Sequence, residues 1–179
     1  TTVCGIVSFH GPMLDRRLGC GTDAYDRDSF LEALTSTEPL GEIAAPSLEV
    51  FCKGEAAGPM LGGTLAQLVA SLGTPYAFKP PRGHVLFLED VAERPYRLDR
   101  MLTQLRLAGI LDSASAVVLG EFLDCDEPGG EPSARAVLAD LLKDFSGPVV
   151  YGFPSGHTTG PLVTLPFGVV DYSVYRLLI

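Results

Sequence analysis

The chain has 179 residues, 46% of them hydrophobic and 20% charged, which is enough for one domain with a sizeable core and too little for two large ones. Its 22 acidic and 13 basic residues give a formal net charge of −9, so nucleic acid and anionic membrane surfaces, which select for basic patches, are not expected as partners. No apolar run of the sequence approaches the roughly 20 residues that cross a bilayer.

The start of the chain and its cysteines are informative about the compartment of the protein. The sequence begins at Thr1 without an initiator methionine, and no basic segment followed by an apolar one marks a signal peptide, so we expect a chain trimmed at its N-terminus. The cysteines Cys4, Cys20, Cys52 and Cys125 are far apart and form no C-x-x-C pair. We therefore expect reduced thiols in a cytoplasmic protein, with no structural zinc site.

The N-terminal part of the chain contains short elements separated by irregular segments. Residues 4–9 are typical of a short strand, and residues 10–28 lack periodicity and indicate a long loop. Ser29, with Glu32 three residues later, has the pattern of a capping box and predicts a short helix that starts there. Another strand is expected at 48–53.

Apolar strands alternate with amphipathic helices in the middle of the chain. The strands are expected at 84–88, 115–122 and 147–153, and the helices at 65–72, 95–108 and 133–142. The first of these helices has Thr64 as its expected N-cap and apolar residues at i, i+3, i+4 and i+7. The glycine-rich segment 58–63 before it indicates a tight turn. Strands that alternate with helices predict a parallel sheet.

The C-terminal tail favours a second kind of β structure. Residues 162–179 alternate enough to predict two antiparallel strands joined near Gly168. Together with the strand at 4–9, they predict an antiparallel β layer beside the parallel sheet. The predicted fold class is therefore α/β, with a parallel sheet, flanking helices and this additional layer.

Acidic and imidazole side chains follow the three predicted parallel strands. Glu89 and Asp90 end the first strand, Glu121 ends the second, and His157 lies in the glycine-rich loop after the third. Ligands of parallel α/β sheets gather beyond the carboxyl ends of the strands, so we expect a site at this edge. A carboxylate there can orient an imidazole and stabilise its charged form. A solvated or helix-capping acidic loop is the alternative interpretation for Glu89 and Asp90.

A nucleophile for such a histidine is not evident in the sequence. No serine lies in a G-x-S-x-G elbow. Ser155 is two residues from His157, but Pro154 precedes it, and near neighbours in a loop rarely face each other. The acidic neighbours of Cys125 are expected to raise its thiol pKa, which opposes activation. The acidic segment 124–131 lacks the spacing of an EF-hand loop and is expected to be solvated.

Six segments occur in the order found in the LD-carboxypeptidase A family, which also includes the microcin C self-immunity peptidase. They are FHGPM, GPMLGGTLAQLVASLGTP, VLFLEDVAERPYRLDRMLTQLRLAG, AVVLGEF, YGFPSGH and TLPFG. The chain resembles this family over nearly its whole length. The resemblance implies a swivelling β/β/α domain of a cytoplasmic serine carboxypeptidase that removes terminal D-alanine from peptidoglycan tetrapeptides during murein recycling. It also implies that no metal or organic cofactor is needed.

The resemblance implies roles for two residues. Glu89 stands at the glutamate of the family's LED motif and His157 at the family's histidine, which implies the Glu and His of a Ser–His–Glu triad. The family's nucleophile lies in a preceding N-terminal domain, and nothing like its motif occurs here. The chain would then be a C-terminal domain that is inactive alone, with residues 1–45 as interdomain connection and short helix and 46–179 as core.

Three further residues are expected to contact the substrate. Gly62, Gly63 and Thr64 stand where the family usually has GGN, and Thr64 lacks the amide donor of that asparagine. Ser155 replaces a common aromatic residue beside His157, which is expected to open the pocket. The implied substrate is a muropeptide or another small peptide. An acyl-adenylate substrate of the microcin type, a non-catalytic peptide-binding or assembly module, and a homodimer stay open as alternatives.

Overall fold

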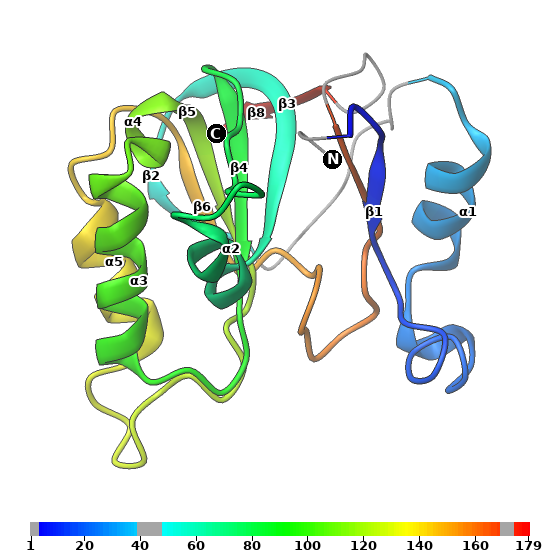
Figure 1. Cartoon of the computed structure of the whole chain (residues 1–179). Helices are drawn as coiled ribbons and strands as arrows, with labels where there is room; N and C mark the ends of the chain where they lie inside the picture. The colour runs from blue at the N-terminus through cyan, green and yellow to red at the C-terminus, as the bar shows by residue number, and fades with distance from the viewer. Residues whose placement is uncertain (1–3, 39–47, 169–173) are drawn as a thin grey trace.

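The computed structural model of the chain describes residues 4–38, 48–168 and 174–179. These residues form three layers, which are a group of helices, a six-stranded sheet and a two-stranded sheet (Figure 1). Helices α2, α3 and α5 lie on one side of the large sheet, and β1 and helix α1 lie on the other side (Figure 1). The predicted α/β class with an additional antiparallel β layer is confirmed.

The large sheet has the strand order β2-β6-β5-β4-β3-β8. Its strands are β2 (Glu49–Cys52), β3 (Glu55–Thr64), β4 (His84–Glu89), β5 (Ala114–Leu119), β6 (Val149–Tyr151) and β8 (Val174–Leu178). Strands β3, β4, β5 and β6 are parallel to one another, whereas β2 pairs antiparallel with β6 at one edge and β8 pairs antiparallel with β3 at the other. The predicted parallel sheet is therefore present, and β4, β5 and β6 are its three predicted strands.

The glycine-rich segment 58–63 does not form the predicted tight turn. It belongs to β3, which pairs with β4 in parallel and with β8 in antiparallel register. Its glycines allow close contact between strands, because a Cβ atom on Gly62 would lie 1.8 Å from the carbonyl oxygen of Phe87. The turn prediction was wrong because the close backbone contact that requires glycine is made with the neighbouring strand β4, which the local sequence does not show.

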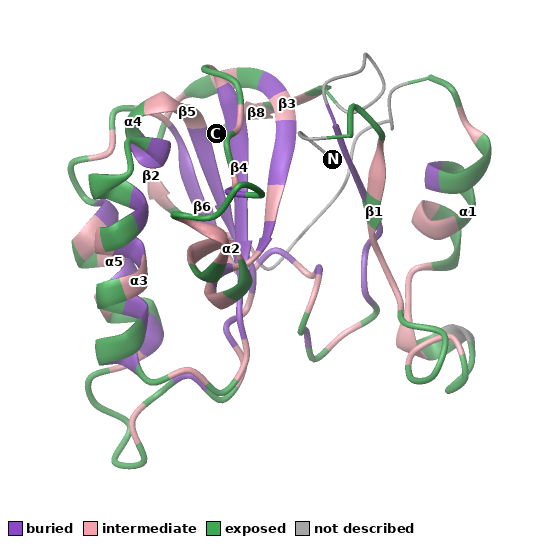
Figure 2. Cartoon of the chain, viewed as in Figure 1, coloured by how far each residue is buried: buried purple, intermediate pink, exposed green. Residues whose placement is uncertain are grey.

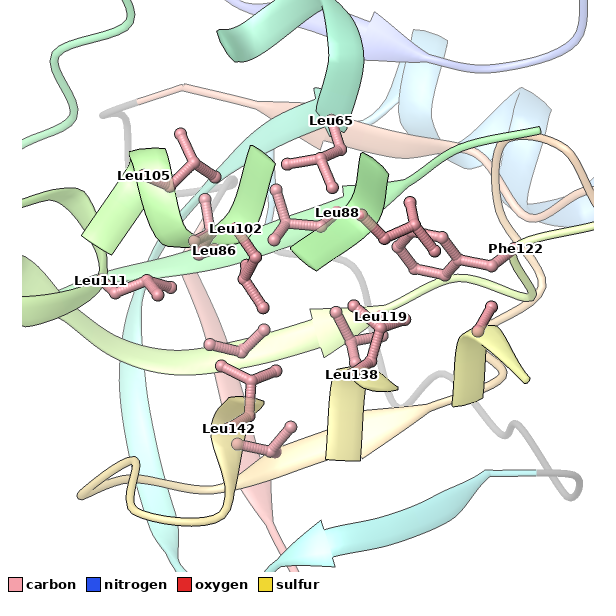
Figure 3. Close-up of a cluster of buried hydrophobic side chains, with 14 of the residues drawn as sticks. Leu65, Leu86, Leu88, Leu102, Leu105, Leu111, Leu119, Phe122, Leu138 and Leu142 are labelled. Carbon is pink, nitrogen blue, oxygen red and sulfur yellow. The ribbon is translucent and has the colours of Figure 1, made fainter. Parts of the chain in front are cut away.

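The helices bury one face of the sheet. They are α2 (Leu65–Ser71), α3 (Pro95–Leu107), the short α4 (Ile110–Ser113), which the sequence did not predict, and α5 (Ala134–Leu142). A cluster of leucines from the helices, β4 and β5 fills this interface, including Leu65, Leu86, Leu88, Leu102, Leu105, Leu119, Leu138 and Leu142 (Figure 3). Ser133, where the sequence predicted the start of this helix, is the N-cap of α5 and accepts a hydrogen bond from the Ala136 N–H at 3.1 Å.

The other face of the sheet is covered by the second β layer. Strand β1 (Ser8–His10) pairs antiparallel with β7 (Leu165–Phe167), and Phe87 of β4 packs with Phe153 and Phe167 on this side. With both faces covered, β4 is buried along its whole length (Figure 2). The tail strands β7 and β8 pair with β1 and β3, so the prediction that they pair with each other was wrong.

The N-terminal part also contains η1 (Thr22–Ala24) and α1 (Arg27–Thr35). Helix α1 starts earlier than predicted, with Asp26 as its N-cap, and the Asp26 carboxylate accepts a hydrogen bond from the Ser29 N–H at 2.7 Å. Ser29 instead lies inside the helix. The capping-box prediction was wrong because an acid three residues upstream offers a charged acceptor to the same N–H group.

Candidate active site

The carboxyl ends of β3, β4 and β6 bring three predicted site residues together. Thr64, the last residue of β3, lies opposite Glu89, the last residue of β4, in the parallel register. His157 lies in the loop that follows β6. Glu89 and His157, which are 68 positions apart in the sequence, therefore meet at one edge of the sheet.

The carboxylate of Glu89 accepts hydrogen bonds at both of its oxygens. Its Oε2 accepts from Nδ1 of the His157 ring at 2.7 Å and from the His157 backbone N–H at 2.9 Å. Its Oε1 accepts from the hydroxyl of Thr64 at 2.6 Å. The Glu89 side chain is 1% exposed and the His157 side chain 45% exposed. A buried acid thus holds an imidazole that reaches the surface.

This contact determines which nitrogen of His157 carries the proton. An ionised carboxylate can only accept hydrogen bonds, so Nδ1 is the donor, and in the neutral ring Nε2 is left as an acceptor. An imidazole held in this way can take a proton at Nε2 while the carboxylate stabilises the charge that results. The arrangement is suited to general acid–base chemistry.

The surroundings of Glu89 keep it ionised. Burial raises the pKa of Glu89, but the hydrogen bonds from Thr64 and from the backbone and ring of His157, with the charge of nearby His10, together lower it by more. The net effect is a pKa below the ordinary value of a glutamate. Glu89 is therefore negatively charged at neutral pH, as its hydrogen-bond donors require.

Asp90 points away from His157 and serves helix α2. Its Oδ2 accepts from the Ala66 N–H in the first turn of α2 at 2.8 Å, and its Oδ1 accepts from the Val91 N–H at 2.9 Å. Burial, with the charges of Glu89 and Glu93, raises the pKa of Asp90 more than these two hydrogen bonds lower it. Each of the two interpretations left open by the sequence therefore applies to one acid. Glu89 contacts the imidazole, and Asp90 caps a helix.

Two glycines leave room for the Glu89 side chain. A Cβ atom on Gly120, just after β5, would lie 2.7 Å from Cβ of Glu89. A Cβ atom on Gly156 would lie 2.6 Å from Oε2 of Glu89, and Gly156 has a φ of 77°, which favours glycine. The loop that carries His157 can cover the carboxylate because these positions have no side chain.

The other predicted substrate contacts have different surroundings. Ser155 is fully buried, and its hydroxyl donates to the carbonyl oxygen of Val163 at 2.7 Å. Gly63 faces open space on one side, because a Cβ atom there would meet no other atom within 4 Å. The hydroxyl of Thr64 is directed to Glu89. A substrate contact by Gly63, Thr64 or Ser155 stays a prediction.

Two charged residues hold the segment that follows His157. Glu121 accepts hydrogen bonds from Thr158 and Thr159, and Arg17 donates to backbone carbonyl groups of the same segment. The position of Glu121 at a strand end was a signal in the sequence, although it gave no partner. Arg17 lies in a segment without periodicity, and no pattern singled it out.

Several other features bear on the chemistry of the chain. Across residues 4–38, 48–168 and 174–179, no group of three or more histidine, cysteine, aspartate or glutamate side chains is placed to hold a metal ion. No helix within these same ranges is long and apolar enough to cross a membrane. Burial, with the charges of Asp90, Glu93 and Asp126, raises the pKa of Cys125 to about 11. The predicted direction of this shift is confirmed, and burial is its larger cause.

Comparison with known sequences identifies the family. A family model described as LD-carboxypeptidase C-terminal domain matches residues 57–170. A Streptomyces coelicolor protein that carries the name of a carboxypeptidase is 42% identical over 172 residues, which cover 94% of this chain and 52% of that protein. The chain thus spans about half the length of the curated relatives it matches.

Solved structures agree with this match. The muramoyltetrapeptide carboxypeptidase from Oxalobacter formigenes is 34% identical with a TM-score of 0.74, over 96% of this chain and 61% of that one. The microcin C7 self immunity protein MccF, in complex with aspartyl sulfamoyl adenosine, is 25% identical with a TM-score of 0.80, over 97% of this chain and 58% of that one. The chain therefore belongs to the LD-carboxypeptidase family and contains the C-terminal domain of that family.

Proposed function

We propose that this chain is the C-terminal catalytic half of a serine LD-carboxypeptidase, which removes the terminal D-alanine from peptidoglycan tetrapeptides in the cytoplasm. The observation that carries the proposal is the 2.7 Å contact between Nδ1 of His157 and the buried carboxylate of Glu89. This contact leaves Nε2 as the basic atom on a ring that reaches the surface. The names of the relatives support murein peptides as the substrate class.

The mechanism follows from the roles of these two side chains. Nε2 of His157 takes the proton of a serine hydroxyl as the serine oxygen attacks the scissile carbonyl carbon. Glu89 stabilises the imidazolium that forms. The imidazolium then gives its proton to the amine of the leaving D-amino acid as the carbon–nitrogen bond breaks. Nε2 then takes a proton from a water molecule as the water oxygen attacks the acyl carbon. The bond to the serine oxygen breaks, the imidazolium returns the proton to that oxygen, and the shortened peptide leaves as the free acid.

The nucleophile in this proposal comes from a domain outside the chain. Ser155, the serine nearest to His157 in the sequence, is buried and donates its hydroxyl to Val163, so it is poorly placed to attack a substrate. The relatives are about twice as long as the matched segment, which leaves room for such a domain. Its backbone N–H groups would also supply most of the oxyanion hole. The isolated chain is then expected to be inactive.

The test uses the full-length protein encoded by the natural gene and the tetrapeptide L-Ala-γ-D-Glu-meso-diaminopimelate-D-Ala. The wild-type protein is expected to release D-alanine, and Glu89→Gln and His157→Ala are expected to lower kcat by about 10³-fold or more. The variant Asp144→Asn, at an exposed position outside the site, is the matched control. Full activity of the His157 variant would contradict the triad, and turnover by the isolated chain would contradict the external nucleophile.

A second substrate class has its own support. The MccF structure holds aspartyl sulfamoyl adenosine, and Thr64 departs from the asparagine that is usual in the family. Comparison of kcat/KM for the tetrapeptide with that for an aminoacyl-adenylate analogue with a cleavable bond decides between the two. A non-catalytic binding module predicts a third result, in which calorimetry detects tetrapeptide binding while the full-length protein turns over neither compound.

A further inference from the structure

The segment 158–160, directly after His157, is held by a carboxylate. Oε1 of Glu121 accepts a hydrogen bond from the hydroxyl of Thr158. Its Oε2 accepts one from the N–H of Thr159 at 2.9 Å and one from the hydroxyl of Thr159 at 2.8 Å. Glu121 comes two residues after the end of β5. The acid therefore satisfies the donors of this segment from the edge of the sheet.

The same segment is held by a cation from the N-terminal part of the chain. The guanidinium of Arg17 donates to the carbonyl oxygen of Gly160 at 2.9 Å and also to that of Thr158. A third donor hydrogen bond reaches the carbonyl oxygen of Ala24 at 2.8 Å. Arg17 thus binds two carbonyl oxygens of the segment whose hydroxyl and N–H groups bind Glu121. It connects the loop to a part of the chain more than 140 positions upstream.

These contacts matter because they hold the residues directly after His157, whereas the hydrogen bonds of Ser155 hold the residues before it. Gly156 precedes His157 with a φ of 77°, and Gly160 ends the held segment, so glycines flank it on both sides. Within the loop, the hydrogen bonds of Glu89 are to the backbone N–H and Nδ1 of His157. Those two hydrogen bonds hold the imidazole against Glu89. Residues 158–160 determine the path of the backbone after His157 and so the direction in which Nε2 points.

We propose that Glu121 and Arg17 are positioning residues that hold the loop so that His157 stays on Glu89 with Nε2 directed outward. Neither residue touches the imidazole, and both act through the backbone and hydroxyl groups of 158–160. A misplacement of a catalytic group by about 1 Å can cost about 10²-fold in rate, so such an anchor has a kinetic effect. The kinetic part of this inference rests on the proposed function, and the geometric part does not.

The geometric part is tested on the chain itself by NMR. Glu121→Ala and Arg17→Ala are expected to speed hydrogen exchange of the His157 amide by about tenfold or more and to shift its ring ¹⁵N signals, while amides of β4 and β5 keep their protection. Glu121→Gln and Arg17→Lys keep part of the hydrogen bonding and are expected to have intermediate effects. The exposed ion pair of Glu55 and Arg176 supplies the control variants Glu55→Ala and Arg176→Ala.

The outcomes separate this inference from the proposed function. The positioning role is wrong if, in both alanine variants, the exchange rate of the His157 amide stays within about twofold of wild type and the ring ¹⁵N signals do not shift. If those variants do not fold, the Gln and Lys variants decide by the same criterion. When Glu121→Ala or Arg17→Ala is introduced into the full-length protein, we expect kcat to fall by about tenfold with KM unchanged. A wild-type enzyme without peptidase activity would contradict the proposed function, and the NMR result would still decide the positioning role.

Discussion

Thr64 donates its hydroxyl to Oε1 of Glu89 at 2.6 Å, so this residue helps to hold the acid. Thr64→Val removes this donor from a buried carboxylate. We expect the pKa of Glu89 to rise and the free energy of unfolding to fall by about 1–2 kcal/mol. Carboxyl ¹³C NMR and urea denaturation measure the two quantities. Thr64→Ser keeps the donor and should resemble wild type, and an unchanged Glu89 pKa in Thr64→Val would contradict the role.

The lowered pKa of Glu89 predicts how stability depends on pH. A carboxyl with a folded pKa below its ordinary value, about 4.3 for glutamate, contributes stability that is present above that value and is lost as the pH falls through the folded pKa. Asp90, whose pKa is raised by burial, has the opposite sign and cannot cause this loss. Glu89→Gln should therefore flatten the decline of the unfolding free energy between about pH 5 and 3. Exposed Glu32→Gln should keep the decline, and an equally steep decline in Glu89→Gln would refute the prediction.

The contact between Glu89 and His157 was predictable because both residues follow parallel strands, whose carboxyl ends share an edge. The partner of Thr64 was not predictable in the same way. The local pattern predicts an N-cap, and Thr64 does occupy that position of α2, yet its hydroxyl donates to Glu89. Asp90 supplies the acceptor in the first turn of the helix instead. Local rules missed this exchange because both acids come from the neighbouring strand.

At the scale of elements, the loop after β6 depends on having no side chain at Gly156. In Gly156→Ala the new methyl group would lie 2.6 Å from Oε2 of Glu89, on a backbone whose φ of 77° disfavours alanine. We expect the unfolding free energy to fall by about 2 kcal/mol or more. The His157 amide should also lose protection from hydrogen exchange. Gly160→Ala is the matched control, because a Cβ atom there meets no other atom within 4 Å. Equal stability of the two variants would exclude a steric role for Gly156.

Elements with a strong periodic signal were predicted, and those whose identity depends on distant partners were not. Helices α2, α3 and α5 and strands β4, β5 and β6 follow from apolar spacing and runs. The tail strands pair with β1 and β3, whose residues lie more than 100 positions upstream, as for Leu165 opposite His10. Sequence alternation gives the direction of a side chain and contains no information on which distant strand accepts the hydrogen bonds.

At the scale of the whole molecule, thiol chemistry reports on folding. Cys4 and Cys20 are exposed, whereas Cys125 is buried and has a pKa of about 11. Iodoacetamide at neutral pH is expected to modify the two exposed thiols quickly and Cys125 only when the core opens. Mass spectrometry across a urea series measures this, and Cys125 labelling should follow the loss of circular dichroism. Labelling of Cys125 in the native protein as fast as that of Cys20 would contradict the prediction.

The fold class and the family were predictable for the whole molecule because the apolar pattern and the segment order extend over nearly all of the chain. The link between Arg17 and the loop after His157 was not, although it joins residues 141 positions apart. A single arginine in an irregular segment has no periodicity and no motif that would distinguish it from a solvated side chain. Such contacts become visible only once the two β layers are placed together.

The unequal access to the two members of the pair has a consequence for chemical complementation. The imidazole is 45% exposed and the carboxylate 1% exposed, so a solute from bulk water can enter the place of the first and not of the second. Under the proposed function, added imidazole should partly restore activity to a His157→Gly variant of the full-length protein, whereas added formate should not restore activity to Glu89→Ala.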